Sequence, residues 1–249
     1  MYLLRLVLIV LWFIIFLVLT LPMLVFEIVC RQFNREKSEL QSQEAVRFLM
    51  KGVLFLAGVK VTVKGKENIP DGEPVLYVPN HRSYFDFVVT FINIKSPVFN
   101  VGKKELAYVP LIGQWVMLIG TFLMDRKSRK KGYRTIEETV RAVKEGKSVV
   151  IYPEGTRNKG RMEEPMRFRE GSLKISAWSG CKCVPVALLN TRDIYENHRP
   201  LIKKTDVTLI FGEPIDPAEL SQEELKNYGA LVRGRIVDMI LAEEGVKNG

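Results

Sequence analysis

The sequence predicts an α/β fold, in which a mixed, largely parallel sheet is flanked by helices and preceded by a hydrophobic two-helix membrane element. Three observations favour this fold. Residues 6–26 form an apolar run without a charge, short β-branched runs alternate with helical stretches from Val59 onward, and 47% of the 249 residues are hydrophobic. We therefore expect membrane-anchoring helices over residues 1–57 and one globular domain over residues 58–249.

The first apolar run, LVLIVLWFIIFLVLTLPMLVF over residues 6–26, is long enough to cross a bilayer, which takes about 20 apolar residues. A secretory signal peptide is the alternative, but its apolar core is usually only about 7–15 residues long. Basic residues follow the run at Arg31, Arg35 and Lys37, whereas Arg5 precedes it. The length of the run therefore predicts a retained anchor in the cell membrane, and the charge asymmetry predicts that the following domain lies on the cytoplasmic face.

The second segment, residues 38–59, starts polar and becomes apolar, with Arg47 and Lys51 on one helical face. The pattern predicts an amphipathic helix. Such a helix either lies in the headgroup region beside the first helix or packs on the globular domain as an ordinary surface helix. The residues alone leave both arrangements open.

The globular domain is expected to contain seven short strands. They fall near residues 59–65, 75–80, 97–102, 121–125, 148–154, 181–189 and 206–215. Helices are expected from about Ser83, over residues 128–146 and from Ser221, where Glu224 three positions later completes a capping-box pattern. Strands that alternate with helices in this way are typical of a largely parallel sheet.

The stretch VPNHRSYFDFVV, residues 78–89, places a histidine and an aspartate where a strand gives way to a helix. If Ser83 caps that helix, Asp86 is its third residue and its carboxylate points back towards His81. Asp86 is then either a helix-start acid stabilised by the dipole or the partner that fixes the histidine tautomer for proton transfer. A covalent serine mechanism is disfavoured because the G-x-S-x-G elbow is absent and a capping hydroxyl is engaged.

Four ordered blocks resemble the glycerolipid acyltransferase family of the PlsC type over roughly residues 55–215. The blocks are N-H-x-x-x-x-D, K-x-E-L-x-x-x-P-x-x-G, [FY]-P-E-G-T-R and a V-P-V stretch. They correspond here to Asn80-His81 with Asp86, Lys103 with Glu105-Leu106-Pro110-Gly113, Tyr152 to Arg157, and Val184-Pro185-Val186. One block alone is weak, but four in order are a specific pattern.

The resemblance implies a glycerol-3-phosphate acyltransferase-like fold and transfer of a fatty acyl group from acyl-CoA or acyl-carrier protein to the sn-2 hydroxyl of lysophosphatidate. The product is phosphatidate, a precursor in phospholipid biosynthesis. His81 would act as general base and Asp86 would orient it, without a covalent acyl-enzyme and without a metal or cofactor. The resemblance also favours a two-helix element that is inserted from the cytoplasmic side.

The resemblance further implies an acceptor site composed of Lys103, Arg126, Glu154, Gly155, Thr156 and Arg157. Arg157 and Lys103 would bind the phosphate, and the glycine would permit a tight turn. Glu154 would bind the glycerol hydroxyl, pair with a nearby base, or support the local fold. Without the resemblance, Arg157 is a salt-bridged turn arginine and Lys103 is a solvated surface lysine.

A net charge of +9 favours an anionic partner such as a lipid surface, a phosphorylated metabolite or nucleic acid. Dispersed basic residues without a base-stacking motif make nucleic acid the weakest of these. Three cysteines form no disulfide framework, and the C-x-C pair lacks a second ligand pair for zinc, in agreement with a reducing compartment. Two functions stay open beside the main one: an acyltransferase for glycerol 3-phosphate, another lysophospholipid or an amino-acid lipid, and a non-catalytic lipid-binding module.

Overall fold

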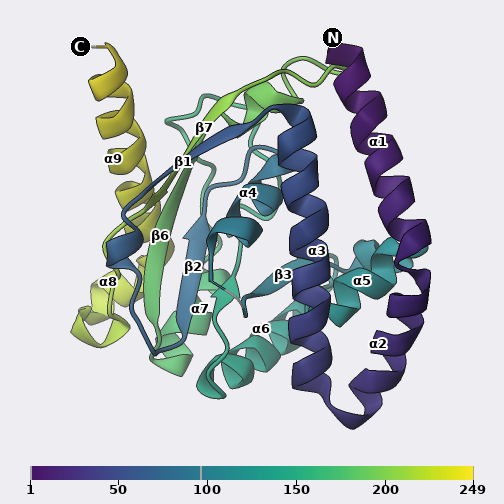
Figure 1. Ribbon diagram of the computed structural model, residues 1–249. Helices are drawn as coiled ribbons and strands as arrows, with labels where there is room; N and C mark the ends of the chain where they lie inside the picture. The colour runs from purple at the N-terminus through teal and green to yellow at the C-terminus, as the bar shows by residue number, and fades with distance from the viewer. Residues whose placement is uncertain (1, 96, 249) are drawn as a thin grey trace.

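The computed structural model describes residues 2–95 and 97–248 as a sheet flanked by helices on both faces (Figure 1). The strands are β1 Lys60–Lys64, β2 Val75–Pro79, β3 Phe99–Lys103, β4 Phe122–Met124, β5 Val149–Val150, β6 Lys182–Leu189 and β7 Asp206–Phe211. Within the described residues the sheet has seven strands in the order β1-β7-β6-β2-β5-β3-β4. All neighbours are parallel except β6 and β7, which confirms the mixed, largely parallel sheet.

The helices also follow the expected order, with two differences. They are α1 Tyr2–Leu19, α2 Leu21–Phe33, α3 Arg35–Ala57, α4 Phe85–Asn93, α5 Ile112–Leu118, α6 Arg129–Lys144, α7 Glu170–Ser179, α8 Gln222–Lys226 and α9 Tyr228–Asn248. The capping box at Ser221 and Glu224 is present, but the closing helix expected there is divided at Asn227 into α8 and α9.

A two-helix N-terminal element is not confirmed, because the described part of this segment contains three helices. The apolar run is divided between two helices. Helix α1 ends at Leu19, and α2 begins at Leu21 with Pro22 in its first turn. Proline is tolerated there because the N–H it lacks has no intrahelical partner in a first turn. By length and composition, α1 is the one helix among the described residues that is able to cross a membrane.

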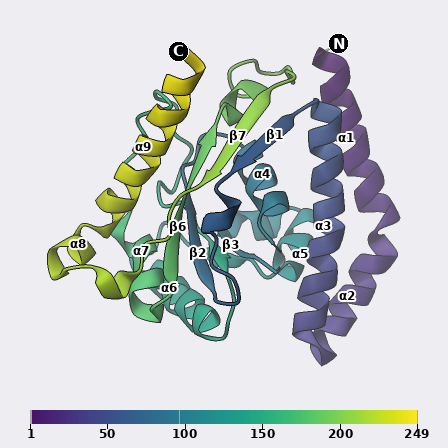
Figure 2. The same ribbon diagram turned by 60° about the vertical axis from the view of Figure 1, so that its left-hand side comes forward.

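Helix α3 is packed on the globular domain (Figures 1 and 2). Of the two arrangements expected for this segment, the structure therefore has the packed helix and not the helix in the headgroup region. Arg47, which a headgroup-bound helix would expose, is only 5% exposed, and its guanidinium donates to the carbonyl of Phe91 in α4. Gln43 donates to the carbonyl of Ile119, just after α5, at 3.2 Å. The predicted boundary at residue 57 lies where α3 ends, but α3 shares a hydrophobic core with the sheet.

The two faces of the sheet carry separate apolar cores. Along β2, the side chains of Val75 and Tyr77 join the core under α1, α3 and α4, whereas those of Leu76 and Val78 join the core under α6, α7 and α9. This alternation is the two-residue period of a strand that is buried on both faces.

The topology gathers the loops that contain the predicted site. Strands β2, β5, β3 and β4 are neighbours and run parallel, so their carboxyl ends lie along one edge of the sheet. His81 follows β2, residues 152–157 follow β5, Lys103 ends β3 and Arg126 follows β4. This carboxyl edge is where ligands bind in open α/β sheets.

Candidate active site

A histidine and an aspartate form a hydrogen-bonded pair at the carboxyl end of β2. Nδ1 of His81 lies 2.9 Å from Oδ2 of Asp86. The same oxygen accepts the backbone N–H groups of Arg82 at 2.5 Å and Ser83 at 2.7 Å, and Asp86 is fully buried. A carboxylate only accepts hydrogen bonds, so the protonated ring nitrogen is Nδ1, and Nε2 is left as the nitrogen that can take a proton.

The expected helix cap at Ser83 is wrong, because α4 begins at Phe85 and its cap residue is Tyr84. The Asp86 carboxylate, rather than a serine cap, accepts the N–H groups of the turn, so Asp86 reaches back from the second residue of the helix. The hydroxyl of Ser83 is engaged elsewhere: it accepts the N–H of Phe85 at 3.0 Å and donates to Oε2 of Glu196 at 2.7 Å. Ser83 is therefore a structural group of the turn.

The ring of Tyr152 packs against the imidazole. The two ring centroids lie 4.5 Å apart, and the phenol is hydrogen-bonded to Oγ1 of Thr90 in α4 at 2.7 Å. Burial, and then the negative charge of Asp86, raises the pKa of the Tyr152 phenol far above its usual range. Tyr152 thus presents a neutral ring to His81.

Glu154 holds the backbone of the histidine turn. Oε1 accepts the N–H of His81 at 2.6 Å and Oε2 accepts the N–H of Met166 at 2.8 Å, while the residue is only 3% exposed. Burial raises the pKa of this carboxyl, although both backbone hydrogen bonds oppose the shift. Asn158 donates its N–H to the carbonyl of His81 at 2.7 Å, so both backbone groups of the histidine are bonded to residues 154–158. This geometry favours support of the local fold among the alternatives expected for Glu154.

The tight turn expected at Gly155 is present. Its φ is +71°, a region that disfavours side chains, and a Cβ there would lie 2.9 Å from the guanidinium carbon of Arg169. Arg126 donates to the Gly155 carbonyl, which attaches the end of β4 to this loop. Burial and the nearby positive charge of Arg169 lower the pKa of Arg126. Thr156, the next residue, has an exposed side chain.

Arg157 lies against the turn that follows His81. Its guanidinium carbon is 3.5 Å from the centroid of the Tyr84 ring, and Nη1 is 3.5 Å from Oε1 of Glu196. Nη1 is buried and has no hydrogen-bond acceptor among the described residues. The side chain as a whole is 31% exposed. The arginine is thus salt-bridged, as expected without the family resemblance, and its Nη1 group donates no hydrogen bond to the described residues.

Lys103 is an exposed lysine whose Nζ lies 3.8 Å from Oε1 of Glu105. Its neighbour Lys104 pairs with Asp125 at 2.6 Å, and that hydrogen bond raises the pKa of Lys104 and lowers the pKa of Asp125. Lys103 shares the carboxyl edge with the histidine, but no contact between described residues joins it to the histidine turn.

Sequence reasoning missed Glu196, which contacts the histidine turn from a loop 113 residues away from Ser83. No local motif marks it. It also assigned no role to Asn80, whose side-chain amide exchanges two hydrogen bonds with the backbone of Leu188 in β6. Asn80 thereby fixes the end of β2 from which His81 projects.

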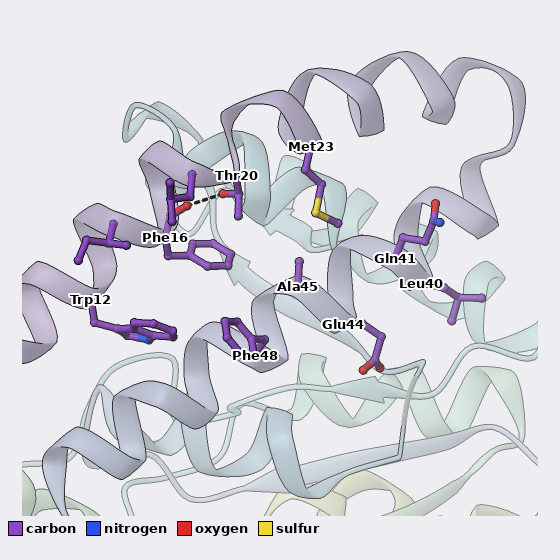
Figure 3. Close-up of a pocket in the computed structure, with 11 residues that line it drawn as sticks. Trp12, Phe16, Thr20, Met23, Leu40, Gln41, Glu44, Ala45 and Phe48 are labelled. Atoms are coloured by element: carbon purple, nitrogen blue, oxygen red, sulfur yellow. Dashed lines mark hydrogen bonds between the residues drawn. The ribbon is translucent and has the colours of Figure 1, made fainter.

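A separate apolar groove of about 720 Å³ lies between α1, α2 and α3 (Figure 3). Its lining residues are Trp12, Ile15, Phe16, Leu19, Thr20, Met23, Leu40, Gln41, Glu44, Ala45 and Phe48. It includes none of the predicted site residues. A smaller cavity of about 60 Å³ shares Phe16 with it and is bounded by Phe87, the residue after Asp86.

A histidine that is hydrogen-bonded to a buried carboxylate, at the carboxyl edge of a largely parallel sheet, is an arrangement that can take a proton from a hydroxyl or a water molecule. The family model described as Acyltransferase matches residues 60–189, which is more than half of the chain. The chain belongs to this acyltransferase family, which confirms the resemblance.

Relatives agree with this assignment. A protein of Borreliella burgdorferi named 1-acyl-sn-glycerol-3-phosphate acyltransferase is 29% identical over 192 residues, which cover 77% of this chain and 76% of the relative. An Escherichia coli K12 protein of the same name is 29% identical over 189 residues, covering 76% and 75%. The crystal structure of the 1-acyl-sn-glycerophosphate (LPA) acyltransferase PlsC from Thermotoga maritima has the same fold, with a TM-score of 0.77, 24% identity and coverage of 97% and 96%.

Proposed function

We propose that this protein transfers a fatty acyl group from a thioester to the sn-2 hydroxyl of 1-acylglycerol 3-phosphate, giving phosphatidate for phospholipid biosynthesis. The observation that carries the proposal is the 2.9 Å pair of His81 and Asp86 beside the loop of Arg157. The names of the relatives support the acceptor. The alternative of a non-catalytic lipid-binding module gives no reason for a buried carboxylate to hold a histidine in one tautomer.

The proposed reaction is a direct transfer. Nε2 of His81 takes the proton of the acceptor hydroxyl as its oxygen attacks the thioester carbonyl carbon. Asp86 stabilises the imidazolium, 2.9 Å away. When the tetrahedral intermediate collapses, the carbon–sulfur bond breaks and the imidazolium returns its proton to the departing thiolate. Ser83 forms no acyl-enzyme because its hydroxyl is held by Phe85 and Glu196.

The acceptor phosphate is proposed to bind at Arg157, whose buried Nη1 has no acceptor among the described residues and whose planar group is suited to phosphate oxygens. Arg126, bonded to the Gly155 carbonyl, adds positive charge from the end of β4, and exposed Lys103 adds charge from the end of β3. Thr156, an exposed residue, belongs to the same loop. Glu154 is proposed to support this loop rather than to bind the acceptor.

The N-terminal helices support a membrane placement. Helix α1 is long and apolar enough for a bilayer, and most of its side chains are exposed. We propose that the helices hold the catalytic domain on the cytoplasmic face of the cell membrane, where acyl-CoA or acyl-carrier protein brings the donor and a lysolipid presents its headgroup. The basic residues that follow the apolar run support this orientation.

The test is acyl transfer by the purified full-length protein in mixed micelles. Lysophosphatidate, glycerol 3-phosphate, another lysophospholipid and an amino-acid lipid are compared as acceptors, each with acyl-CoA and with acyl-carrier protein. We expect phosphatidate to form and His81→Ala to lower kcat by at least about 10²-fold. His198→Ala, which removes the chain's only other histidine, is the matched control and should retain wild-type activity. Preference for another acceptor would replace the proposed substrate, and full activity in His81→Ala would remove the proposed base.

A second variant tests the phosphate contact. Arg157→Ala should raise the KM for lysophosphatidate about tenfold or more, because a charged hydrogen bond to the phosphate is lost. Arg134→Ala removes an exposed arginine of α6 and controls for the loss of one positive charge. Equal KM values for the two variants would count against a specific contact at Arg157.

A further inference from the structure

Glu196 is a buried carboxylate beside the proposed acceptor site, and the reaction as derived above does not use it. It follows the short 3-10 helix Thr191–Ile194, in the loop between β6 and β7. Its side chain is only 5% exposed although it lies in a loop. Carboxylates are rarely buried to this extent unless they are paired and hydrogen-bonded, so its partners indicate its role.

Both oxygens of Glu196 hold the turn that follows the histidine. Oε2 accepts the hydroxyl of Ser83 at 2.7 Å, and Oε1 accepts the backbone N–H of Tyr84 at 2.8 Å. On the other side of the same turn, Asp86 accepts the N–H groups of Arg82 and Ser83. Two carboxylates from distant parts of the chain therefore fix this turn.

The same carboxylate faces Arg157. Its Oε1, already bonded to Tyr84, lies 3.5 Å from Nη1 of the arginine, and the guanidinium is stacked on the Tyr84 ring at 3.5 Å. The pair has no hydrogen bond, since Nη1 has no acceptor among the described residues. Glu196 thus attracts the guanidinium and restricts its position without accepting a hydrogen bond from Nη1.

The Glu196 loop is also attached to the residue after the arginine. Arg192 donates from Nη1 to the carbonyl of Asn158 at 3.1 Å and from Nε to the side chain of Asn197 at 2.7 Å. Asn158 in turn donates its N–H to the carbonyl of His81 at 2.7 Å. The carboxylate is therefore anchored to the histidine turn and to the arginine loop.

We propose that Glu196 is a positioning residue that sets the distance between the phosphate-binding guanidinium of Arg157 and the general base His81. The inference rests on the proposed function and deepens it. The few single bonds between the phosphate and the sn-2 hydroxyl of lysophosphatidate limit the distance between these groups, so a common anchor for the guanidinium and the histidine turn brings the hydroxyl within reach of the imidazole. Glu196 itself touches no reacting atom.

Two substitutions of Glu196 distinguish the effect of its charge on Arg157 from its support of the histidine turn through hydrogen bonds. Glu196→Gln retains an oxygen for the Tyr84 N–H, and its amide can donate to the Ser83 hydroxyl, so it removes mainly the negative charge beside Arg157. Glu196→Ala removes both hydrogen bonds as well. Glu243→Gln, which disrupts a 2.6 Å ion pair with Lys64 on the far edge strand β1, is the matched control.

For Glu196→Gln we expect the KM for lysophosphatidate to rise about tenfold, with the thermal midpoint and the KM for the acyl donor unchanged. Glu243→Gln should leave the acceptor KM unchanged. In an Arg157→Ala background, the further change Glu196→Gln should alter the acceptor KM by less than about twofold, because the two residues act together. Glu196→Ala should in addition lower the thermal midpoint.

Three results would overturn the inference. They are an unchanged acceptor KM in Glu196→Gln, additive effects in the double variant, and a lowered KM in Glu196→Gln, which would show that the carboxylate competes with the phosphate. A wild-type protein that forms no phosphatidate refutes the proposed function itself. The failure of the function and the failure of the inference are therefore distinguished by the wild-type measurement.

Discussion

Replacing Glu154 by alanine tests whether this carboxylate supports the histidine turn or binds the acceptor. The substitution leaves the N–H groups of His81 and Met166 without the acceptors that lie at 2.6 and 2.8 Å. Each buried donor without a partner costs about 1–3 kcal/mol, and removal of a buried carboxylate offsets part of that cost. We expect the free energy of unfolding to fall by about 2–4 kcal/mol, which lowers the thermal midpoint by roughly 4–16 °C.

The same variant should lose activity through kcat. A histidine whose backbone is no longer held shifts relative to the acceptor hydroxyl, and a displacement of about 1 Å costs on the order of 10²-fold in rate. Acyl transfer at saturating substrate and chemical denaturation of the same preparation measure both effects. Glu170→Ala is the matched control, since Glu170 in α7 accepts one N–H from Gly229 in α9 at 2.8 Å and neither is a proposed site residue; it should lower stability but retain kcat.

The pH dependence of Glu154→Gln gives an independent check. Burial raises the pKa of the Glu154 carboxyl above its ordinary 4.5, so just above pH 4.5 the folded protein binds more protons than the unfolded chain. The wild-type unfolding free energy should therefore fall, relative to that of Glu154→Gln, as the pH rises through this range.

A raised acceptor KM in Glu154→Ala, with stability and kcat unchanged, would refute the supporting role and restore the glycerol-binding alternative.

Three further substitutions test the remaining parts of the site. Asp86→Asn should lower kcat by at least about 10³-fold, because a neutral amide stabilises the His81 imidazolium poorly; retention within tenfold, at saturating substrate, would contradict this. Gly155→Ala should lower the unfolding free energy by at least about 1–2 kcal/mol, since φ is +71° and the new methyl group meets Arg169, and an unchanged denaturation midpoint would be inconsistent with that turn. Tyr152→Phe removes one hydrogen bond to α4 and should cost at most about 1.5 kcal/mol with kcat nearly unchanged; a large fall in kcat would give the hydroxyl a role in the reaction.

The strands were predictable because each is a short apolar run, and the parallel order placed their carboxyl ends together. His81 and Asp86 were predictable as a pair because the end of the strand and the start of the helix are adjacent in the sequence. The helix cap was placed one residue early, at Ser83 instead of Tyr84. Asp86 satisfies the N–H groups of the turn, and the capping propensity of Ser83 did not reveal that competition.

The break in the N-terminal apolar run had a signal in Pro22, which lies in the first turn of α2. The high hydropathy of the whole run, residues 6–26, led us to expect one helix there instead of two. Glu196 had no comparable signal, because its partners Ser83 and Tyr84 precede it by 113 and 112 residues. The role of Glu154 was ambiguous for a similar reason: the two N–H groups that it accepts come from segments 73 and 12 residues away.

Helix α3 changes what a soluble version of this protein must contain. Val46, Leu49 and Val53 on this helix belong to the same apolar core as the sheet, and the β1 strand begins three residues after the helix ends. Truncation at residue 57 would remove the part of this core that α3 contributes, so a detergent-free fragment should begin before Asn34, which caps α3. Phe16 of α1 and Leu24 of α2 belong to this core as well, so in the proposed membrane placement the N-terminal helices would hold the domain through packed contacts and not through a flexible linker.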